Sequence, residues 1–411
     1  MSVPFQLVDH PGQLASLDEV MHSAPWIAFD TEFVSEYSYL PQLCLVQIAV
    51  PETRVLIDAV AISDLRPVWE WLLESDRPVI VHAGREELLF CLRATGQIPP
   101  GWFDVQLAAG FATTVYPASY GKLVERFCGR TLPKGETRTD WRQRPLTRRQ
   151  QEYACQDVIY LAQIYQRLMD ELTTRQRLSW LQDEMASWQE KTAATLQGES
   201  WHRLPSIHRL TPRQLAIARE VWRWRESEAA HRNIFPRRVL RDDLIVELAR
   251  RESDNPQRIR AVRGMEWRKV SRSVDAIVDA IRRGLETPAD QCPELPRGGP
   301  PTTIGNLLPQ FLNTALHSLC VAESIAPTLV ATMQDVRDFS EFHLSPAAWR
   351  HRPPPKLTQG WRKELIGNTL NRLLSGELAI RIENPKSDHP LILEERPRDD
   401  EGPQKREHPV E

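Results

Sequence analysis

Residues 26–58 read WIAFDTEFVSEYSYLPQLCLVQIAVPETRVLID, and this stretch decides the fold of the first half of the chain. It contains three short runs that are apolar or alternating and rich in β-branched residues, separated by Pro41 and Pro51. Such runs predict three strands. The elements expected next are a helix at 65–73, a strand at 78–82, a helix at 85–93 and more helix from 103 to about 172. This order predicts an α/β domain with a mixed sheet and flanking helices.

Two carboxylates stand in the first of these strands. Asp30 and Glu32 are two residues apart, so strand alternation places both side chains on the same face. Neighbouring carboxylates repel each other, and burying them is costly without a cation. Their hard oxygen atoms suit Mg²⁺ or Mn²⁺. The alternative is that Asp-Thr-Glu ends an edge strand in solvent.

A tyrosine and an aspartate lie farther along in QEYACQDVIYL (151–161). Tyr153 and Asp157 are four residues apart, so on a helix they share one face. Asp157 would complete a metal site begun on the strand, and Tyr153 would orient an attacking water. The alternative is a solvated aspartate beside a half-buried tyrosine.

The segment VHAGREELLF (81–90) leaves a strand, passes Gly84 and enters a helix with Glu86 and Glu87 in its first turn. Acidic residues at that position suit the helix dipole, which is one explanation for them. The functional explanation makes Glu87 another carboxylate of the same site.

The composition is that of a soluble globular protein. The chain has 411 residues, 41% hydrophobic and 26% charged, which suggests about two or three domains of ~150 residues each. The net charge of −3 argues against a general polyanion binder. The six cysteines are scattered without a close pair, which predicts free thiols in a reducing compartment. No signal or spanning segment is evident, so we expect a cytoplasmic protein without membrane attachment.

The second half of the chain is expected to be all-α. Thr211 and Pro212 mark the N-cap and first position of a helix. The segments expected beyond it are helices at 242–251 and 272–283, a linker at 287–303, a mostly helical part at 304–382 and a disordered tail at 383–411. Residues 201–288 hold 20 Lys and Arg against 12 Asp and Glu, so the positive charge is concentrated there.

The motifs, taken in order, resemble the DEDD exonuclease superfamily in its tyrosine-containing branch, and most closely the ribonuclease D family. The resemblance covers residues 5–180 and implies a ribonuclease H-like mixed sheet in an exonuclease domain at 1–200. It rests on four stretches: FDTEFVSEYSYLPQLCLVQIA, VHAGREELLF, TLPKGETRTDWRQRPLT and YACQDVIYL.

The resemblance also implies the chemistry of the site. Two divalent ions, Mg²⁺ or Mn²⁺, would be held by four carboxylates, and Tyr153 would orient the water that hydrolyses the 3′-terminal phosphodiester of RNA, such as a tRNA precursor or other structured RNA. The ligands implied are Asp30, Glu32, Glu87 and Asp157. Phe33 is either a ring that contacts the terminal base or a core aromatic. The family normally has Asp where this chain has Glu87, one methylene longer, which bears on rate and metal preference.

Residues 207–288 resemble the helicase-and-RNase-D C-terminal (HRDC) domain, a small helical bundle that assists nucleic-acid binding. The segment 304–382 lies where a second such domain belongs, and GWRKELIGNTLNRLL (360–374) is its most similar part. Trp222 and Trp224 alternate with arginines and are expected mainly to build the core, although exposed rings could stack on bases. Trp267 also stands among basic residues.

Two other functions fit the sequence less well. One is a DNA 3′→5′ exonuclease on the same fold, and the other is a non-catalytic RNA-binding protein with a decayed nuclease site. A helicase is excluded because no G-x-x-x-x-G-K-[ST] loop occurs. No obligate protein partner is evident.

Overall fold

The computed structural model describes residues 4–74, 77–132, 139–265, 273–295, 307–350, 352–387 and 389–396. The chain forms two compact units, and each gathers separate stretches of sequence. Unit 1 comprises 1–103, 133–162 and 186–299, whereas unit 2 comprises 104–132, 163–185 and 300–411. We describe each unit by itself.

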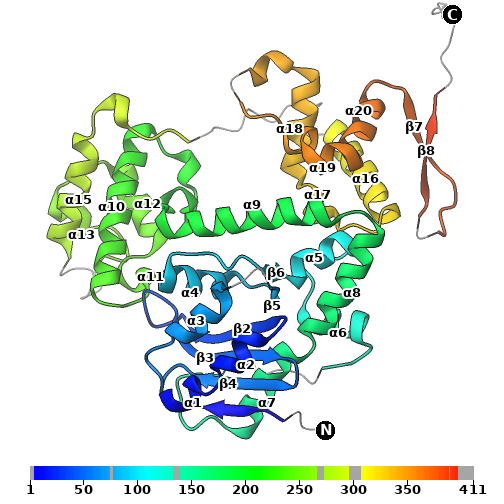
Figure 1. Cartoon of the computed structure of the whole chain (residues 1–411). Coiled ribbons are helices and arrows are strands. Elements are labelled where there is room, and N and C mark those ends of the chain that lie inside the picture. The colour runs from blue at the N-terminus through cyan, green and yellow to red at the C-terminus, as the bar shows by residue number, and fades with distance from the viewer. Residues whose placement is uncertain are drawn as a thin grey trace, which may run out of the picture. The chain divides into compact units, whose positions relative to one another are not determined.

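A six-stranded mixed sheet forms the centre of the first half of the chain (Figure 1). The strand order is β1-β4-β3-β2-β5-β6; β2 pairs antiparallel with β3 and parallel with β5. The strands are β1 (Gln6–Val8), β2 (Ile27–Val34), β3 (Gln42–Val50), β4 (Thr53–Asp58), β5 (Val79–Val81) and β6 (Trp102–Asp104). The predicted mixed sheet is confirmed. Strands β1 and β6 were not predicted, because QLV and WFD each contain a polar residue, whereas β5 stands in the continuous apolar run VIV.

Helices cover both faces of this sheet. Phe29 points to the face where α3 lies and makes an edge-to-face contact with Trp69, at 6.2 Å between ring centroids. Helix α7 crosses β2, β3 and β4, on the face where Leu45 and Leu56 pack with Ala154. The helices of unit 1 in this region are α1 (Pro11–Ala15), α2 (Asp18–Ser23), α3 (Arg66–Leu73), α4 (Arg85–Thr95) and α7 (Arg148–Ile159).

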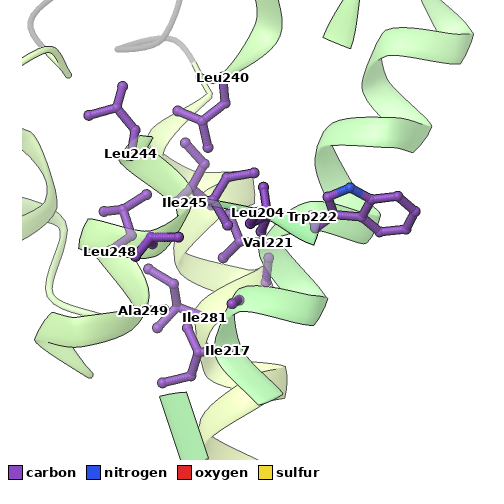
Figure 2. Close-up of a cluster of buried hydrophobic side chains, with 14 of the residues drawn as sticks. Leu204, Ile217, Val221, Trp222, Leu240, Leu244, Ile245, Leu248, Ala249 and Ile281 are labelled. Atoms are coloured by element: carbon purple, nitrogen blue, oxygen red, sulfur yellow. The ribbon is translucent and has the colours of Figure 1, made fainter. Parts of the chain in front are cut away.

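A separate helical bundle follows within unit 1, and its apolar core is drawn in Figure 2. Thr211 caps the first long helix, with its hydroxyl accepting from the backbone N–H of Gln214, and Pro212 opens it as predicted. Val221, Ile245 and Ile281, from three different helices, meet in the core. The helices are α10 (Pro212–His231), α11 (Pro236–Val239), α12 (Asp242–Arg251), α13 (Pro256–Arg260) and α15 (Val274–Glu286).

The tryptophans of this bundle serve mainly in packing. Trp222 is buried and belongs to the apolar cluster, at whose margin it lies in Figure 2. Trp224 is partly buried and packs against the same cluster. The expected core role is therefore confirmed for both rings. Trp267 lies outside the described residues.

Unit 2 is built mainly of helices. Trp361 and Arg362, from the part of segment 304–382 in which a second HRDC-like domain is predicted, are buried. Arg362 donates to the backbone carbonyls of Leu329 and Val330. Its helices are α5 (Val105–Ala112), α6 (Tyr120–Cys128), α16 (Leu307–Ala322), α17 (Pro327–Val330), α18 (Met333–Leu344), α19 (Gly360–Arg362) and α20 (Asn368–Leu374). Two further helices, α8 (Leu161–Thr174) and α9 (Leu178–Gln197), contribute residues to both units.

The prediction of a disordered tail from residue 383 is wrong for its first part. β7 (Leu378–Ile382) and β8 (Leu391–Glu395) form an antiparallel hairpin. Short apolar runs on both strands and the cross-strand ion pair Arg381–Glu394 stabilise it. The high density of charges and prolines hid these runs from the sequence analysis. Residues 397–411 lie outside the described part of the chain.

All six cysteines are free thiols, as the scattered spacing predicts. Among the residues that the structure describes, no helix combines the length and apolar character needed to cross a bilayer.

Candidate active site

Strand β2 presents the first two site carboxylates on one face of the sheet. Asp30 is paired with Gln47 of β3, and Glu32 with Leu45. Directly opposed residues of an antiparallel pair point to the same face, which here is the face that α7 covers. A bulge follows between Glu32 and Phe33. The strand pattern and helix cover together place Asp30 and Glu32 beneath α7.

Helix α7 supplies the tyrosine and the aspartate. Thr147 begins it with a capping box, in which its hydroxyl accepts from the backbone N–H of Gln150 and the Gln150 side chain accepts from the backbone N–H of Thr147. Tyr153 and Asp157 lie one turn apart, and the phenol of Tyr153 donates a hydrogen bond to the Asp157 carboxylate. The predicted shared face is therefore present.

The loop before α7 is fixed by one arginine. All five N–H groups of the Arg144 guanidinium are used: two donate to the Asp58 carboxylate, and three donate to backbone carbonyls. These carbonyls belong to Cys44, Trp141 and Gln143. Trp141 then stacks on the Tyr153 ring, with 6.2 Å between centroids and an interplanar angle of 29°. Arg144 thus holds the loop that buttresses the site tyrosine.

Glu87 reaches the site from the start of α4. A Cβ on Gly84, the residue before the helix, would lie 2.5 Å from Cγ2 of Val81, so only glycine fits this close turn. Glu86 is paired with Arg85, whereas Glu87 is 5% exposed and accepts a hydrogen bond of 2.6 Å from the hydroxyl of Thr31. The structure therefore distinguishes the two glutamates, and it is Glu87 that faces β2.

Thr31 is a site residue that the sequence analysis did not identify. It lies between Asp30 and Glu32. The pairing of β2 with β5 ends at Ala28, so the start of α4 can contact the edge of β2 beyond that residue. The Thr31 hydroxyl positions the Glu87 carboxylate from this edge. The only sequence signal was a hydroxyl between two acidic residues, which by itself indicates nothing.

The four carboxylates interact strongly with one another. Burial, followed by repulsion from Glu87, Asp157 and Glu32, raises the pKa of Asp30 well above its usual value. Burial and repulsion from Asp157 and Glu87 raise the pKa of Glu32 to about 8. Burial raises the pKa of Asp157 to about 7, although the hydrogen bond from Tyr153 opposes this shift. The structure thus brings all four predicted ligands together.

The residues fit a divalent cation. Carboxylates that raise one another's pKa in a partly buried site are the hard, negatively charged donor set that Mg²⁺ or Mn²⁺ prefers. Within the described ranges, no three His, Cys, Asp or Glu side chains are already arranged so that they could hold a metal ion.

Phe33 follows Glu32 on β2, directly after the bulge. Its ring packs edge-on against Phe90 of α4, with 5.6 Å between centroids, and remains partly exposed. This contact favours the core-aromatic interpretation, and a contact with the terminal base remains a prediction.

Comparison with known proteins gives the same picture. Residues 5–173 match the model of the 3′-5′ exonuclease family, and residues 214–281 match that of the HRDC domain. A ribonuclease D of Nitrobacter hamburgensis is 33% identical over 92% of this chain and 97% of its own. One from Bartonella henselae is 29% identical over 89% of both chains. The crystal structure of Escherichia coli RNase D matches with a TM-score of 0.77 and 28% identity, over 91% of this chain and 99% of that one.

The mixed sheet, the carboxylates beneath α7 and the matching family model define a 3′-5′ exonuclease of the DEDD superfamily, a class that depends on divalent metal ions. Within this class, an HRDC domain follows the nuclease domain. The chain is also similar to ribonuclease D proteins along nearly its whole length. The chain belongs to the ribonuclease D family, and it is a hydrolytic exoribonuclease.

The raised pKa values predict how the metal-free protein responds to pH. An unfolded chain loses its carboxyl protons near pH ~4, whereas folded Asp157 and Glu32 retain theirs to about 7 and about 8. The folded chain therefore binds more protons across this interval, and the free energy of unfolding falls as the pH rises through it. We expect the metal-free Tm to decrease over this range and Mn²⁺ to restore it at the alkaline end.

Asp30→Asn removes one of the repelling charges and should raise the metal-free Tm at the alkaline end of this range. The control is Asp9→Asn, which changes an exposed aspartate. Thermal melts of the three proteins across the range provide the measurement. A metal-free Tm that does not change with pH would contradict the predicted repulsion.

Thr31→Val should remove the donor to buried Glu87 and lower both turnover and stability. A hydrogen bond to a charged group contributes roughly 1.5–3 kcal/mol, and the valine keeps the shape of the side chain. Thr31→Ser retains the hydroxyl and serves as the matched control. Urea unfolding and initial rates would test this, and equal effects of Val and Ser would contradict a role for the hydroxyl.

Proposed function

We propose that this exoribonuclease removes nucleotides one at a time from the 3′ ends of RNA in the cytoplasm, using two Mg²⁺ or Mn²⁺ ions. The ions would be held by Asp30, Glu32, Glu87 and Asp157. The observation that carries the proposal is that burial and the charges of Glu87 and Asp157, from two helices, raise the pKa values of Asp30 and Glu32 on β2. Beside them, Tyr153 stays protonated. The free cysteines fit a reducing compartment.

Structured RNA, including tRNA precursors, is the proposed substrate. The similar Escherichia coli enzyme is described as an exoribonuclease involved in structured RNA processing. This chain aligns with 99% of that enzyme's length, so it has counterparts for both the nuclease and the helical parts.

Tyr153 would act as a neutral group in the reaction. When bound, the divalent ions supply positive charge that favours ionisation of the attacking water and stabilises the leaving 3′ oxygen. Burial and the nearby carboxylates raise the pKa of Tyr153 well above its usual value, so its phenol stays protonated. The phenol donates its proton to the hydrogen bond with Asp157, and its oxygen can accept a hydrogen bond from the attacking water. Tyr153 therefore orients water without serving as a base.

The HRDC domain would bind the RNA backbone through basic side chains. Not all of its basic residues would take part, because many are already paired with acidic residues. Nine of its arginines in the described part of the chain form ion pairs with nearby acids: Arg219, Arg223, Arg225, Arg232, Arg237, Arg241, Arg251, Arg282 and Arg283. Arg258 and Arg260 of α13 and the following Arg263 are exposed, and no ion pair of theirs occurs among the described residues. These three side chains are the proposed phosphate contacts.

The proposed reaction predicts release of mononucleotides from the 3′ end. Purified protein with Mg²⁺ or Mn²⁺ should shorten a linear RNA stepwise and extended tRNA precursors to a defined end, while a circular RNA stays intact. Asp157→Asn should reduce turnover below detection because it removes the negative charge of a metal ligand, whereas Asp9→Asn should match the wild type.

Electrophoresis of end-labelled RNA and single-stranded DNA of the same sequence provides the measurement. RNA binding without mononucleotide release with either ion would contradict the proposal and indicate a decayed nuclease. Clear preference for DNA would indicate a DNA exonuclease. An active Asp157→Asn variant would overturn the ligand assignment.

The phosphate contacts predict a change in salt dependence. Replacing Arg258, Arg260 and Arg263 together by Gln should reduce the slope of log affinity against log salt by up to about 2, since each contact on a single strand contributes about 0.7. The matched control replaces the ion-paired Arg237, Arg241 and Arg251 by Gln. Binding is measured by fluorescence anisotropy in EDTA, and equal slopes for the two triple variants would contradict the assignment.

A further inference from the structure

Gln47 is a polar side chain in the interior of an apolar strand. β3 contains LCLVQIAV (43–50), in which the amide of Gln47 stands among aliphatic neighbours. Its side chain is 0% exposed, and neither its nitrogen nor its oxygen has a hydrogen-bond partner among the described residues. A buried amide without partners lowers stability, and Leu or Met would fill the same volume without that cost. The position therefore calls for an explanation other than packing.

Its position places it at the site. Gln47 is the register partner of Asp30 on one side and of Leu56 on the other. Side chains that are directly opposed in an antiparallel pair share a face, with Cβ atoms about 5 Å apart. Leu45 and Leu56, on this same face, pack with Ala154 of α7. The unpartnered amide thus lies beside Asp30 on the α7 side of the sheet.

The chemistry of an amide suits this neighbour. The carboxylates of the site are acceptors when ionised, and a side-chain NH₂ is a donor. A neutral donor can hold a carboxylate in place and still leave the negative charge that attracts a cation. Lys or Arg at position 47 would instead cancel that charge. Outer partners of ligating groups commonly orient them in this way.

We propose that Gln47 is a positioning residue, whose side-chain NH₂ donates a hydrogen bond to the Asp30 carboxylate when that group turns to ligate a divalent ion. The inference rests on the proposed metal-binding function of Asp30. The unpartnered amide lowers the free energy of unfolding, and the proposed hydrogen bond to Asp30 explains why an amide stands at this position.

The test compares Gln47→Met with Ile48→Met in the full-length protein. Ile48 is the next residue, is equally buried, and is paired with Phe29 on the opposite face, so its variant controls for repacking of β3. Gln47→Met should leave the metal-free Tm unchanged or higher. It should also weaken Mn²⁺ binding, measured by calorimetry without RNA, by about 10- to 100-fold, and lower kcat with little change in KM for RNA. Ile48→Met should leave Mn²⁺ affinity at the wild-type value.

The outcomes separate this inference from the proposed function. Wild-type Mn²⁺ binding that Asp30→Asn abolishes supports the proposed function independently of Gln47. With that established, wild-type Mn²⁺ affinity in Gln47→Met, or an equal loss in Ile48→Met, overturns the positioning role. Absence of Mn²⁺ binding by the wild type overturns both. If Gln47→Met does not fold, Gln47→Leu provides the same comparison.

Discussion

The mutual repulsion of the four site carboxylates is the interaction on which the arrangement of the nuclease depends. Burial and the neighbouring carboxylates hold the pKa values of Asp30 and Glu32 above the usual range, and burial does the same for Asp157. The fold compensates with rigid supports: a capping box starts α7 at Thr147, and Arg144 ties the preceding loop to the sheet. These supports allow the site to keep its charges close together until a cation balances them.

Much of the fold and the main site residues could be predicted from the sequence, because they depend on local periodicity. The two-residue spacing of Asp30 and Glu32 fixes their shared strand face, and the four-residue spacing of Tyr153 and Asp157 fixes their shared helix face. Thr211 was recognisable as an N-cap because it precedes Pro212 and an apolar period.

What could not be predicted depends on contacts between distant residues. Thr31 and Glu87 are 56 positions apart in the chain, and no pattern in either segment indicates their hydrogen bond. Gln47 resembles any polar interruption of a strand until its register with Asp30 is known. The surplus of basic residues in the HRDC region is visible in the sequence. Their pairing with acidic residues is not visible there, because pairs such as Arg225–Asp242 form only when two helices meet.

Because every N–H group of Arg144 is already hydrogen-bonded, this arginine should not be counted among the residues near the site that could bind phosphate. With all five N–H groups bound to Asp58 and three carbonyls, this guanidinium has no donor left for a phosphate, so it belongs to the scaffold. Lysine would preserve the charge but offers only three donors from one atom. A relative with lysine at this position would have the same charge there. It would nevertheless need other contacts to hold the loop and the ring of the site tyrosine.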